Sequence, residues 1–312
     1  MRRPHSALTG FLLALASGTL AAFAAPISVT ASFTIPADVA AGVGGEHVRV
    51  RSLTPPNADF HAMQTTPAQV RALAEADLVV AIHPQVETWV ADLEQAGTLK
   101  RPVLYLAKGL IPEAAPARRK HTRHAPGCTC GAHGEDAHVW SDPDNVAAMG
   151  RALPERLAAL DPRNAAAYRA SGAAYAQRMK ALAADIEREL AAIPEERRKI
   201  FSQHNNLSHF ARRFRFTVAG TLLQSASSEA SDPSAKTMAR IVADIRSAKV
   251  PAVFADNTLS DAPLATVARE AGLPPPVKLY TDALDKPGTP AASYEGMMRE
   301  NARRIAAALA AK

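Results

Sequence analysis

Three histidines and one aspartate lie where predicted strands end or where a loop rejoins the fold, and together they could bind a divalent metal ion. His61 lies in the loop after one strand, His204 and Asp282 each directly follow a strand, and His138 lies where a long loop re-enters the folded part. In open parallel sheets, ligands bind beyond the carboxyl ends of the strands. Three neutral imidazoles and one carboxylate suit the four-coordinate site that Zn²⁺ prefers. The residue types therefore indicate a zinc site, although each histidine alone could be a surface or capping residue and Asp282 a turn residue.

A second group of metal-binding residue types lies in the segment 113–137. This segment has no strand or helix periodicity, and loops of this length are usually functional or disordered, so we expect a mobile loop. Its candidate auxiliary metal contacts are His121, His124, Cys128, Cys130 and His133. They could hold a second zinc ion transiently. Alternatively, the segment is a linker whose two cysteines stay free or form a strained disulfide.

Alternating strands and helices are predicted to position these groups. The first half is expected to contain strands Ile27–Ser32, Val48–Leu53, Leu78–Ile82 and Val103–Ala107, with helices near Ala37–Gly42, Pro67–Ala76 and Val86–Glu94. The second half is expected to contain strands Lys199–Ser202, Thr217–Ala219, Ala252–Ala255 and Val277–Tyr280, with helices near Asn205–Phe214, Ser234–Ala248, Pro263–Ala271 and Tyr294–Ala310. Short, continuously apolar strands separated by helices are typical of parallel sheets covered on both faces.

Two helices are predicted between these halves. The first is Asn145–Leu160, and the second runs from Asp161 to about Ala192, where roughly 30 residues would extend about 45 Å. The predicted fold class is therefore α/β, with two lobes that each contain a parallel β-sheet flanked by helices and are joined by one long rigid helix. The predicted divisions are 25–145 for the N-terminal lobe, 146–192 for the linking helices and 193–312 for the C-terminal lobe.

The N-terminal residues 1–24 are predicted to be a cleavable secretory signal. Arg2 and Arg3 precede an apolar stretch at 8–23 that ends in small residues, and cleavage is expected after Ala24. The alternative is an uncleaved membrane anchor, but the stretch is short for the roughly 20 apolar residues that a membrane span needs. We therefore expect a soluble mature protein in the periplasm.

The charge balance is mild and argues against a nucleic-acid partner. The chain has 36 Lys and Arg residues against 30 Asp and Glu, a formal net charge of +6, and loss of Arg2 and Arg3 with the signal would reduce the excess further. The basic residues alternate with acidic ones on predicted helices, as on ordinary solvated helix faces. A nucleic-acid-binding surface would require clustered positive charge.

Five motifs resemble, in the same order along the chain, those of the solute-binding proteins of zinc and manganese ABC importers. They are Val43-Gly44-Gly45-Glu46-His47-Val48 with His61 and Pro67, Ala76-Asp77-Leu78-Val79-Val80 with Glu87 and Trp89, Asp136-Ala137-His138-Val139-Trp140-Ser141-Asp142-Pro143, Ser202-Gln203-His204 with His209-Phe210-Ala211, and Leu279-Tyr280-Thr281-Asp282 with Tyr294 and Asn301. The similarity covers nearly all of the chain after the signal. Among zinc-binding members it is closest to the AztC type.

This resemblance implies a metal ion bound between the two lobes by His61, His138, His204 and Asp282. Manganese-binding relatives usually carry glutamate at the third of these positions, so the histidine implies Zn²⁺ as the cargo. It also implies a periplasmic monomer that delivers the ion to the membrane permease of an ABC importer, and a periplasmic zinc metallochaperone is a possible donor. Two departures are Phe60 and Ala137, which precede the first two ligands where relatives commonly have proline.

A binding protein is expected rather than an enzyme, because four protein ligands leave no coordination position for a reactive water. One alternative is a manganese-binding importer protein. Another is an exported zinc hydrolase in which Asp282 acts as a base and does not bind the metal. His83 follows a predicted strand and is expected to line the site, whereas His47 and His209 are expected to have surface or packing roles.

Overall fold

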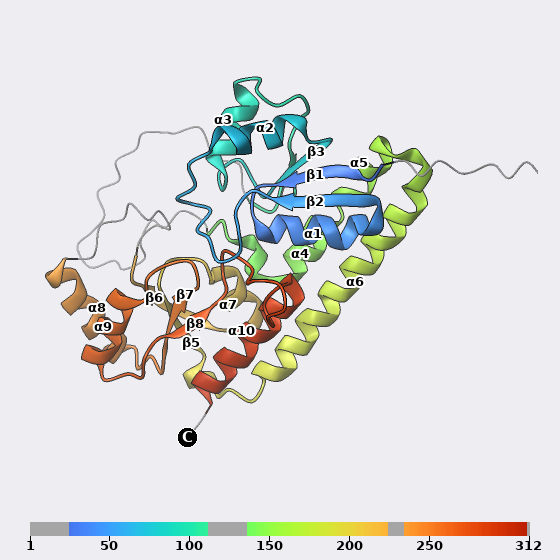
Figure 1. Ribbon diagram of the computed structural model, residues 1–312. Helices are drawn as coiled ribbons and strands as arrows, with labels where there is room; N and C mark the ends of the chain where they lie inside the picture. Colours follow the sequence, from blue (N-terminus) through green and yellow to red (C-terminus); the bar gives the residue numbers. More distant parts are fainter. Residues whose placement is uncertain (1–24, 112–135, 224–233, 311–312) are drawn as a thin grey trace, which may run out of the picture.

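Two sheets of four parallel strands form the framework of the protein, as the computed structural model in Figure 1 shows. The structure describes residues 25–111, 136–223 and 234–310. The first sheet has the strand order β2-β1-β3-β4 and the second β6-β5-β7-β8. The strands are β1 (Ile27–Ala31), β2 (Val48–Ser52), β3 (Leu78–Ala81), β4 (Leu104–Tyr105), β5 (Lys199–Ser202), β6 (Thr217–Thr221), β7 (Val253–Asp256) and β8 (Val277–Leu279). We call the part around β1–β4 the first lobe and the part around β5–β8 the second lobe.

Helices flank both sheets, which explains the burial of the central strands. Every residue of β3 and of β7 is buried, as expected for strands covered on both faces. The helices are α1 (Thr34–Gly44), α2 (Pro67–Glu75), α3 (Thr88–Gln95), α4 (Pro143–Gly150), α5 (Leu153–Leu160), α6 (Ala165–Leu190), α7 (Ser208–Phe214), α8 (Ala235–Ser247), α9 (Ala262–Ala271) and α10 (Tyr294–Leu309). The predicted two-lobed α/β fold is confirmed.

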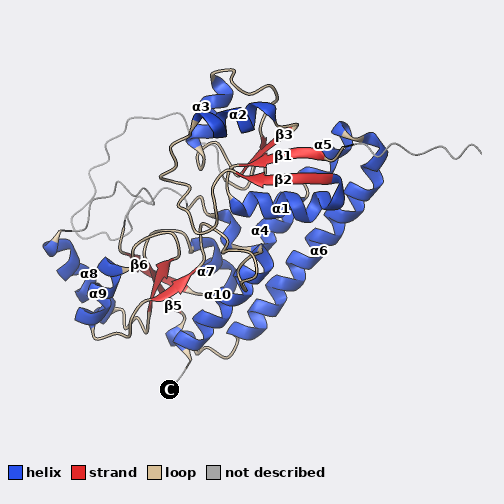
Figure 2. Ribbon diagram, viewed as in Figure 1, coloured by secondary structure: helices blue, strands red, loops and turns tan. Residues whose placement is uncertain are grey.

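The long helix α6 connects the two lobes and runs beside both of them (Figures 1 and 2). Its 26 residues extend about 39 Å at 1.5 Å per residue. It packs against α1, α4, α5 and α10. The largest hydrophobic cluster includes Val29 of β1, Met179 of α6 and Phe254 of β7, so one apolar core continues from the first lobe to the second. Because such interiors are closely packed, this connection resists large changes in the spacing of the lobes.

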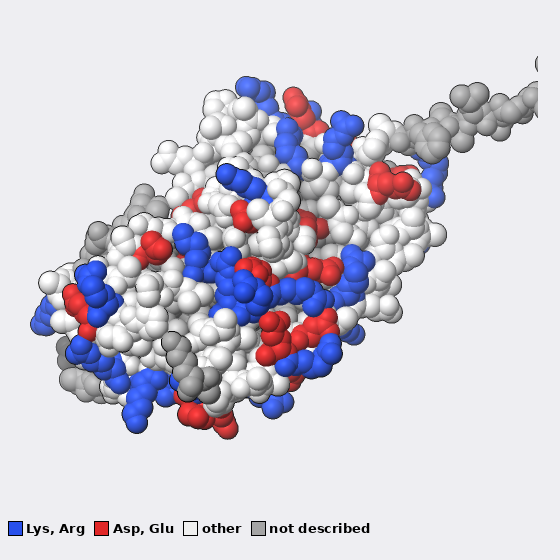
Figure 3. Space-filling view, turned by 60° about the horizontal axis from the view of Figure 1, so that its bottom comes forward, with Lys and Arg blue, Asp and Glu red and all other residues white. Residues whose placement is uncertain are grey.

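Ion pairs reinforce the contact between α6 and its neighbours. Arg178 of α6 pairs with Glu295 of α10 at 3.1 Å, and Asp185 of α6 pairs with Arg299 of α10 at 2.8 Å. Such exposed pairs contribute little individually, because solvent screens the charges. Figure 3, in which the molecule is turned so that the bottom of Figure 1 comes forward, shows basic and acidic side chains interspersed on this face.

The region 145–160 forms two helices, so the prediction of a single helix over Asn145–Leu160 was wrong. The first, α4, begins after Asp142, whose side chain accepts a hydrogen bond from the backbone N–H of Asp144 at 2.9 Å. The second, α5, has Pro154 in its first turn. Proline lacks a backbone N–H and its ring clashes with the carbonyl four residues earlier, so it is tolerated at the start of a helix but not in its interior. Pro154 therefore separates the two helices.

Two predictions are not tested by the structure: the signal at the N-terminus and the boundaries between the lobes and the linking helices. The predicted signal at 1–24 lies outside the described residues, and the predicted divisions at 145 and 192 stay predictions. Among the residues that the structure describes, no helix is both long enough and apolar enough to cross a bilayer.

Candidate metal centre

Four side chains from both lobes converge where the strands of the two sheets end. His61 lies on the loop after β2, His204 follows β5 and Asp282 follows β8. His138 lies just before a short 3₁₀ helix, Val139–Ser141. Within the described residues, these four form a group whose ligand atoms all lie within 4.8 Å of one another. The four residues singled out from the sequence are therefore brought together.

The spacing of these atoms matches a small tetrahedral site. The Nε2 atom of His138 lies 3.3 Å from that of His61 and 3.4 Å from that of His204. From the Asp282 carboxylate, the nearest Nε2 distances are 3.2 Å to His204, 3.7 Å to His138 and 3.8 Å to His61. A zinc ion with bonds of about 2.0–2.1 Å in tetrahedral geometry separates its ligand atoms by about 3.3–3.4 Å. One ion can therefore contact all four side chains after only small adjustments.

The carboxylate of Asp282 is the feature that most strongly indicates a cation. The residue is 1% exposed, and neither of its oxygens has a hydrogen-bond partner in the described part of the structure. Buried charges in proteins are normally paired or coordinate metals, and the Nε2 atoms of three histidines lie within 4 Å of this carboxylate. Burial would raise the pKa of Asp282, but the adjacent His204 and His138 outweigh it and lower the pKa below its usual range. An ionised, buried acceptor therefore faces three imidazole nitrogens.

Two further carboxylates orient the histidine rings, a role that was not predicted for either of them from the sequence. The Nδ1 atom of His204 lies 2.7 Å from Asp256 Oδ2, and both residues are buried. The Nδ1 atom of His138 lies 2.8 Å from Asp136 Oδ1. Carboxylates that accept the other ring N–H of a metal-binding histidine fix its tautomer and leave Nε2 free for the metal. Asp256 ends the buried strand β7, so the strand-end rule that selected His204 could also have selected it.

The third imidazole, His61, is held by aromatic packing. Its ring lies against Phe60, with centroids 3.9 Å apart, and Phe60 stacks on Phe33 at 4.1 Å and 10°. The Nδ1 atom of His61 has no hydrogen bond to any described residue, and burial lowers the pKa of His61 to about 4. Phe60, noted as a departure from the family pattern, therefore supplies a flat surface that supports the first candidate ligand.

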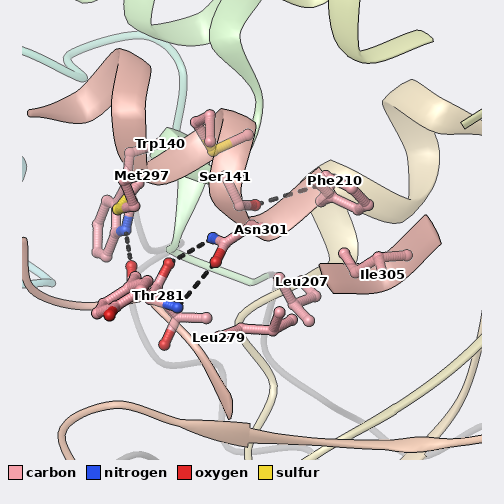
Figure 4. Close-up of a pocket in the computed structure, with 11 residues that line it drawn as sticks. Trp140, Ser141, Leu207, Phe210, Leu279, Thr281, Met297, Asn301 and Ile305 are labelled. Atoms are coloured by element: carbon pink, nitrogen blue, oxygen red, sulfur yellow. Dashed lines mark hydrogen bonds between the residues drawn. The ribbon is translucent and has the colours of Figure 1, made fainter. Parts of the chain in front are cut away.

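Trp140 joins the segment of His138 to the segment of Asp282. Its indole N–H donates to the carbonyl of Thr281 at 2.7 Å, and its own carbonyl accepts from the hydroxyl of Tyr294 at 2.7 Å. Figure 4 shows Trp140 and Thr281 at the edge of a small cavity, where the side chain of Asn301 bonds the backbone next to Thr281. These bonds fix the distance between two candidate ligands that are far apart in the sequence.

The remaining histidines singled out from the sequence have other positions. His83 is buried, and its backbone N–H donates to the carboxylate of Glu87; it does not belong to the metal-binding group found in the described residues. His47 packs edge-on against Tyr168, and His209 bonds the carbonyl of Asp136 at 2.7 Å. The auxiliary loop residues His121, His124, Cys128, Cys130 and His133 lie outside the described residues.

Comparison with known proteins decides the family. The family described as ZnuA, zinc-uptake complex component A, periplasmic, matches residues 29–308. The chain belongs to the ZnuA family. The predicted resemblance to metal-binding proteins of ABC importers is confirmed, whereas the closer assignment to the AztC type stays a prediction.

Relatives of this ZnuA-family protein carry names with different metals. The manganese ABC transporter substrate-binding lipoprotein scaA of Streptococcus gordonii is 25% identical over 288 residues, which cover 91% of this chain and 89% of the relative. The iron-binding protein YfeA of Yersinia pestis is 27% identical over 293 residues, 94% of this chain and 89% of the relative. The solved structure of the periplasmic zinc-binding protein TroA from Treponema pallidum matches with a TM-score of 0.77 at 24% identity, over 92% of this chain and 100% of that chain, and at this identity it supports the fold alone.

Membership of the ZnuA family settles the class of function. The protein is a metal-binding, substrate-binding protein of an ABC transporter, so the prediction of a binding protein rather than an enzyme is confirmed and the hydrolase alternative is wrong. Substrate-binding proteins of this kind work with the membrane permease and ATPase components of their transporter. Because the relatives' names differ in the metal, the identity of the cargo depends on the donor set of this chain.

Proposed function

We propose that the protein captures Zn²⁺ between its lobes with His61, His138, His204 and Asp282 and delivers it to an ABC-type zinc importer. The observation that supports this proposal is the buried carboxylate of Asp282, which has no hydrogen-bond partner among the described residues and faces three imidazole Nε2 atoms at tetrahedral spacing. Imidazole nitrogen suits zinc, whereas manganese favours sites richer in oxygen. The donor set therefore favours zinc as the cargo.

Manganese is the second candidate, and one observation favours it. Both oxygens of Asp282 lie near histidine nitrogens, Oδ1 at 3.7 Å from His138 and Oδ2 at 3.2 Å from His204. A carboxylate that binds through both oxygens would raise the coordination number above four, which suits manganese better than zinc.

Metal substitution distinguishes these two candidates. Titration of the metal-stripped mature protein against a chromophoric chelator is expected to give one tight zinc ion per chain, and manganese in large excess is expected not to displace it. The Co²⁺ form is expected to show the intense visible absorption of four-coordinate cobalt. A weak spectrum typical of six-coordinate cobalt, or displacement of zinc by manganese, would favour the manganese alternative. A second zinc equivalent would implicate the loop residues at 121–133.

Zinc binding near pH 7 is expected to release about one proton per chain. Burial would lower the pKa of His204, but the carboxylates of Asp256 and Asp282 outweigh it and raise the pKa well above its usual value. His204 is therefore protonated in the metal-free protein, whereas His61, with its pKa lowered to about 4, is neutral. Affinity should consequently fall as the pH decreases from about 7, by about tenfold per pH unit while one proton competes with the metal. Calorimetry in two buffers of different ionisation enthalpy measures the proton release, and the absence of any buffer dependence would contradict it.

We further propose that the protein acts in the periplasm as a monomer and docks on the permease of its importer, with a zinc metallochaperone as a possible donor. Support comes from the family description and from the charged, apolar and small-residue pattern of residues 1–24. Several relatives are named lipoproteins, so fractionation must separate the two forms. Recovery in the soluble periplasmic fraction, with a new N-terminus at Ala25, is the expected result, and recovery in the membrane fraction would contradict it.

A further inference from the structure

The loop between β2 and α2 crosses from the first lobe to the second at Asn57, four residues before His61. Asn57 has a backbone φ of 59°, in the left-handed region that few residues other than glycine adopt but that asparagine tolerates. This conformation directs both the backbone and the side chain of Asn57 toward the second lobe. Its backbone N–H donates to the carbonyl of Leu284 at 3.0 Å.

The side chain of Asn57 bonds two different loops of the second lobe. Its Nδ2 donates to Asp285 Oδ1 at 2.6 Å, and its Oδ1 accepts from Asn257 Nδ2 at 2.8 Å. The partners are held in turn, because Asp285 Oδ2 accepts from the hydroxyl of Tyr280 at 2.9 Å and Asn257 donates to the carbonyl of Ala283 at 3.1 Å. Both polar atoms of this amide, Nδ2 and Oδ1, therefore take part in a contact between the lobes.

These two loops are the ones that position candidate ligands of the second lobe. Asn257 directly follows Asp256, which orients His204, and its Oδ1 accepts from the backbone N–H of Thr281, the residue before Asp282. Asn57 therefore ties the loop of His61 to the segments that set the positions of two other ligands.

The position of the His61 side chain depends mainly on the backbone of its loop, whereas the other two histidine rings are also held by carboxylates. His138 and His204 are each oriented by a carboxylate, whereas the Nδ1 atom of His61 has no hydrogen bond to a described residue. His61 is also the most exposed of the four, with 17% of its side chain exposed against 8% for His138 and 1% for His204 and Asp282. The least anchored ligand is thus on the loop that Asn57 bonds to the second lobe.

We propose that Asn57 is a positioning residue that latches the His61 loop of the first lobe to Asn257 and Asp285 of the second lobe, and that breaking this latch speeds release of the metal. The inference rests on the proposed metal-capture function and extends it to the step of release. The three residues are only partly buried, so a docked permease or solvent can reach them. Opening the latch would withdraw His61 and leave three ligands in place.

A charge swap tests the latch. Asn57→Asp places a carboxylate opposite Asp285, where the two oxygens repel each other, so the zinc-loaded mature protein is expected to lose zinc to an excess of chelator about tenfold faster. Asp285→Asn added to Asn57→Asp restores a donor opposite an acceptor, and the release rate is expected to return to within about threefold of the original. Asn57→Gly keeps the left-handed backbone but removes the side chain, and it should also accelerate release about tenfold.

The chain offers a matched control in Asn164, whose Nδ2 donates to Asp161 at the same distance of 2.6 Å without joining the lobes. Asn164→Asp is expected to leave zinc release unchanged. Unchanged release in both Asn57→Asp and Asn57→Gly, or failure of the double variant to restore it, would overturn the latch. Lack of tight zinc binding by the unaltered protein would instead refute the proposed function itself, so the two failures are distinguishable.

Discussion

Replacing Asp282 with asparagine is expected to weaken zinc binding by about 100- to 1,000-fold. Structural zinc sites of four ligands bind with roughly 10–16 kcal/mol in total, so one ligand accounts for about 2.5–4 kcal/mol. Asparagine preserves the size of the side chain but removes the negative charge that faces His61, His138 and His204. The competition titration used for the unaltered protein measures the loss directly.

Asp244→Asn is the control for this variant, because Asp244 lies exposed on α8 in the same lobe. It should bind zinc as the unaltered protein does. A loss of less than about tenfold in Asp282→Asn would mean that Asp282 balances the charge of the imidazoles without binding the metal. In that case the fourth coordination position of the metal would be open. Small anions could then bind there, and their addition would change the spectrum of the Co²⁺ form.

Three of the four candidate ligands could be placed from the sequence because a predicted strand precedes each of them. His204 and Asp282 each come after a short apolar strand, and parallel strands bring their carboxyl ends to one edge of a sheet. His138 has no strand before it, and its place was implied by the family resemblance. The sequence could not show which histidines would be left out, since His83 also follows a buried strand but its backbone bonds Glu87 within the first lobe.

The groups that support the ligands were harder to predict, and the reason is distance along the chain. Asn57 and Asn257 lie 200 residues apart, and Trp140 and Thr281 lie 141 apart. Contacts of this kind depend on how the two lobes pack against each other. A local sequence pattern contains no information on that packing. By contrast, the predicted start of α2 at Pro67 is confirmed, and it depends on neighbouring residues, since Thr66 and Gln69 form a capping box there. The break at Pro154 was equally local and could have been found.

The buried pair of His204 and Asp256 leads to the second prediction with a large effect. Asp256→Asn is expected to lower zinc affinity by about 10- to 100-fold, the usual cost of losing an outer carboxylate of a metal-binding histidine. Both oxygens of the Asp256 carboxylate have hydrogen-bond partners. Oδ1 accepts from Asn206 at 2.8 Å and from Thr281 at 3.0 Å, and Oδ2 faces the imidazole of His204. The amide oxygen of asparagine can still accept a hydrogen bond. Without the negative charge, however, the side chain no longer increases the basicity of His204, and it orients the imidazole ring less firmly.

A double-mutant comparison shows whether Asp256 acts through His204. If it does, Asp256→Asn should have almost no further effect on zinc affinity when His204 is already alanine, because coupled residues are not additive. The proton released on zinc binding should also decrease in Asp256→Asn, since the carboxylate that helps to hold a proton on His204 is gone. Additive losses in the double variant would instead mean that Asp256 stabilises the second lobe generally, through Asn206 and Thr281. Zinc selectivity would then depend on the four candidate ligands alone, and the buried carboxylate behind them would serve the fold.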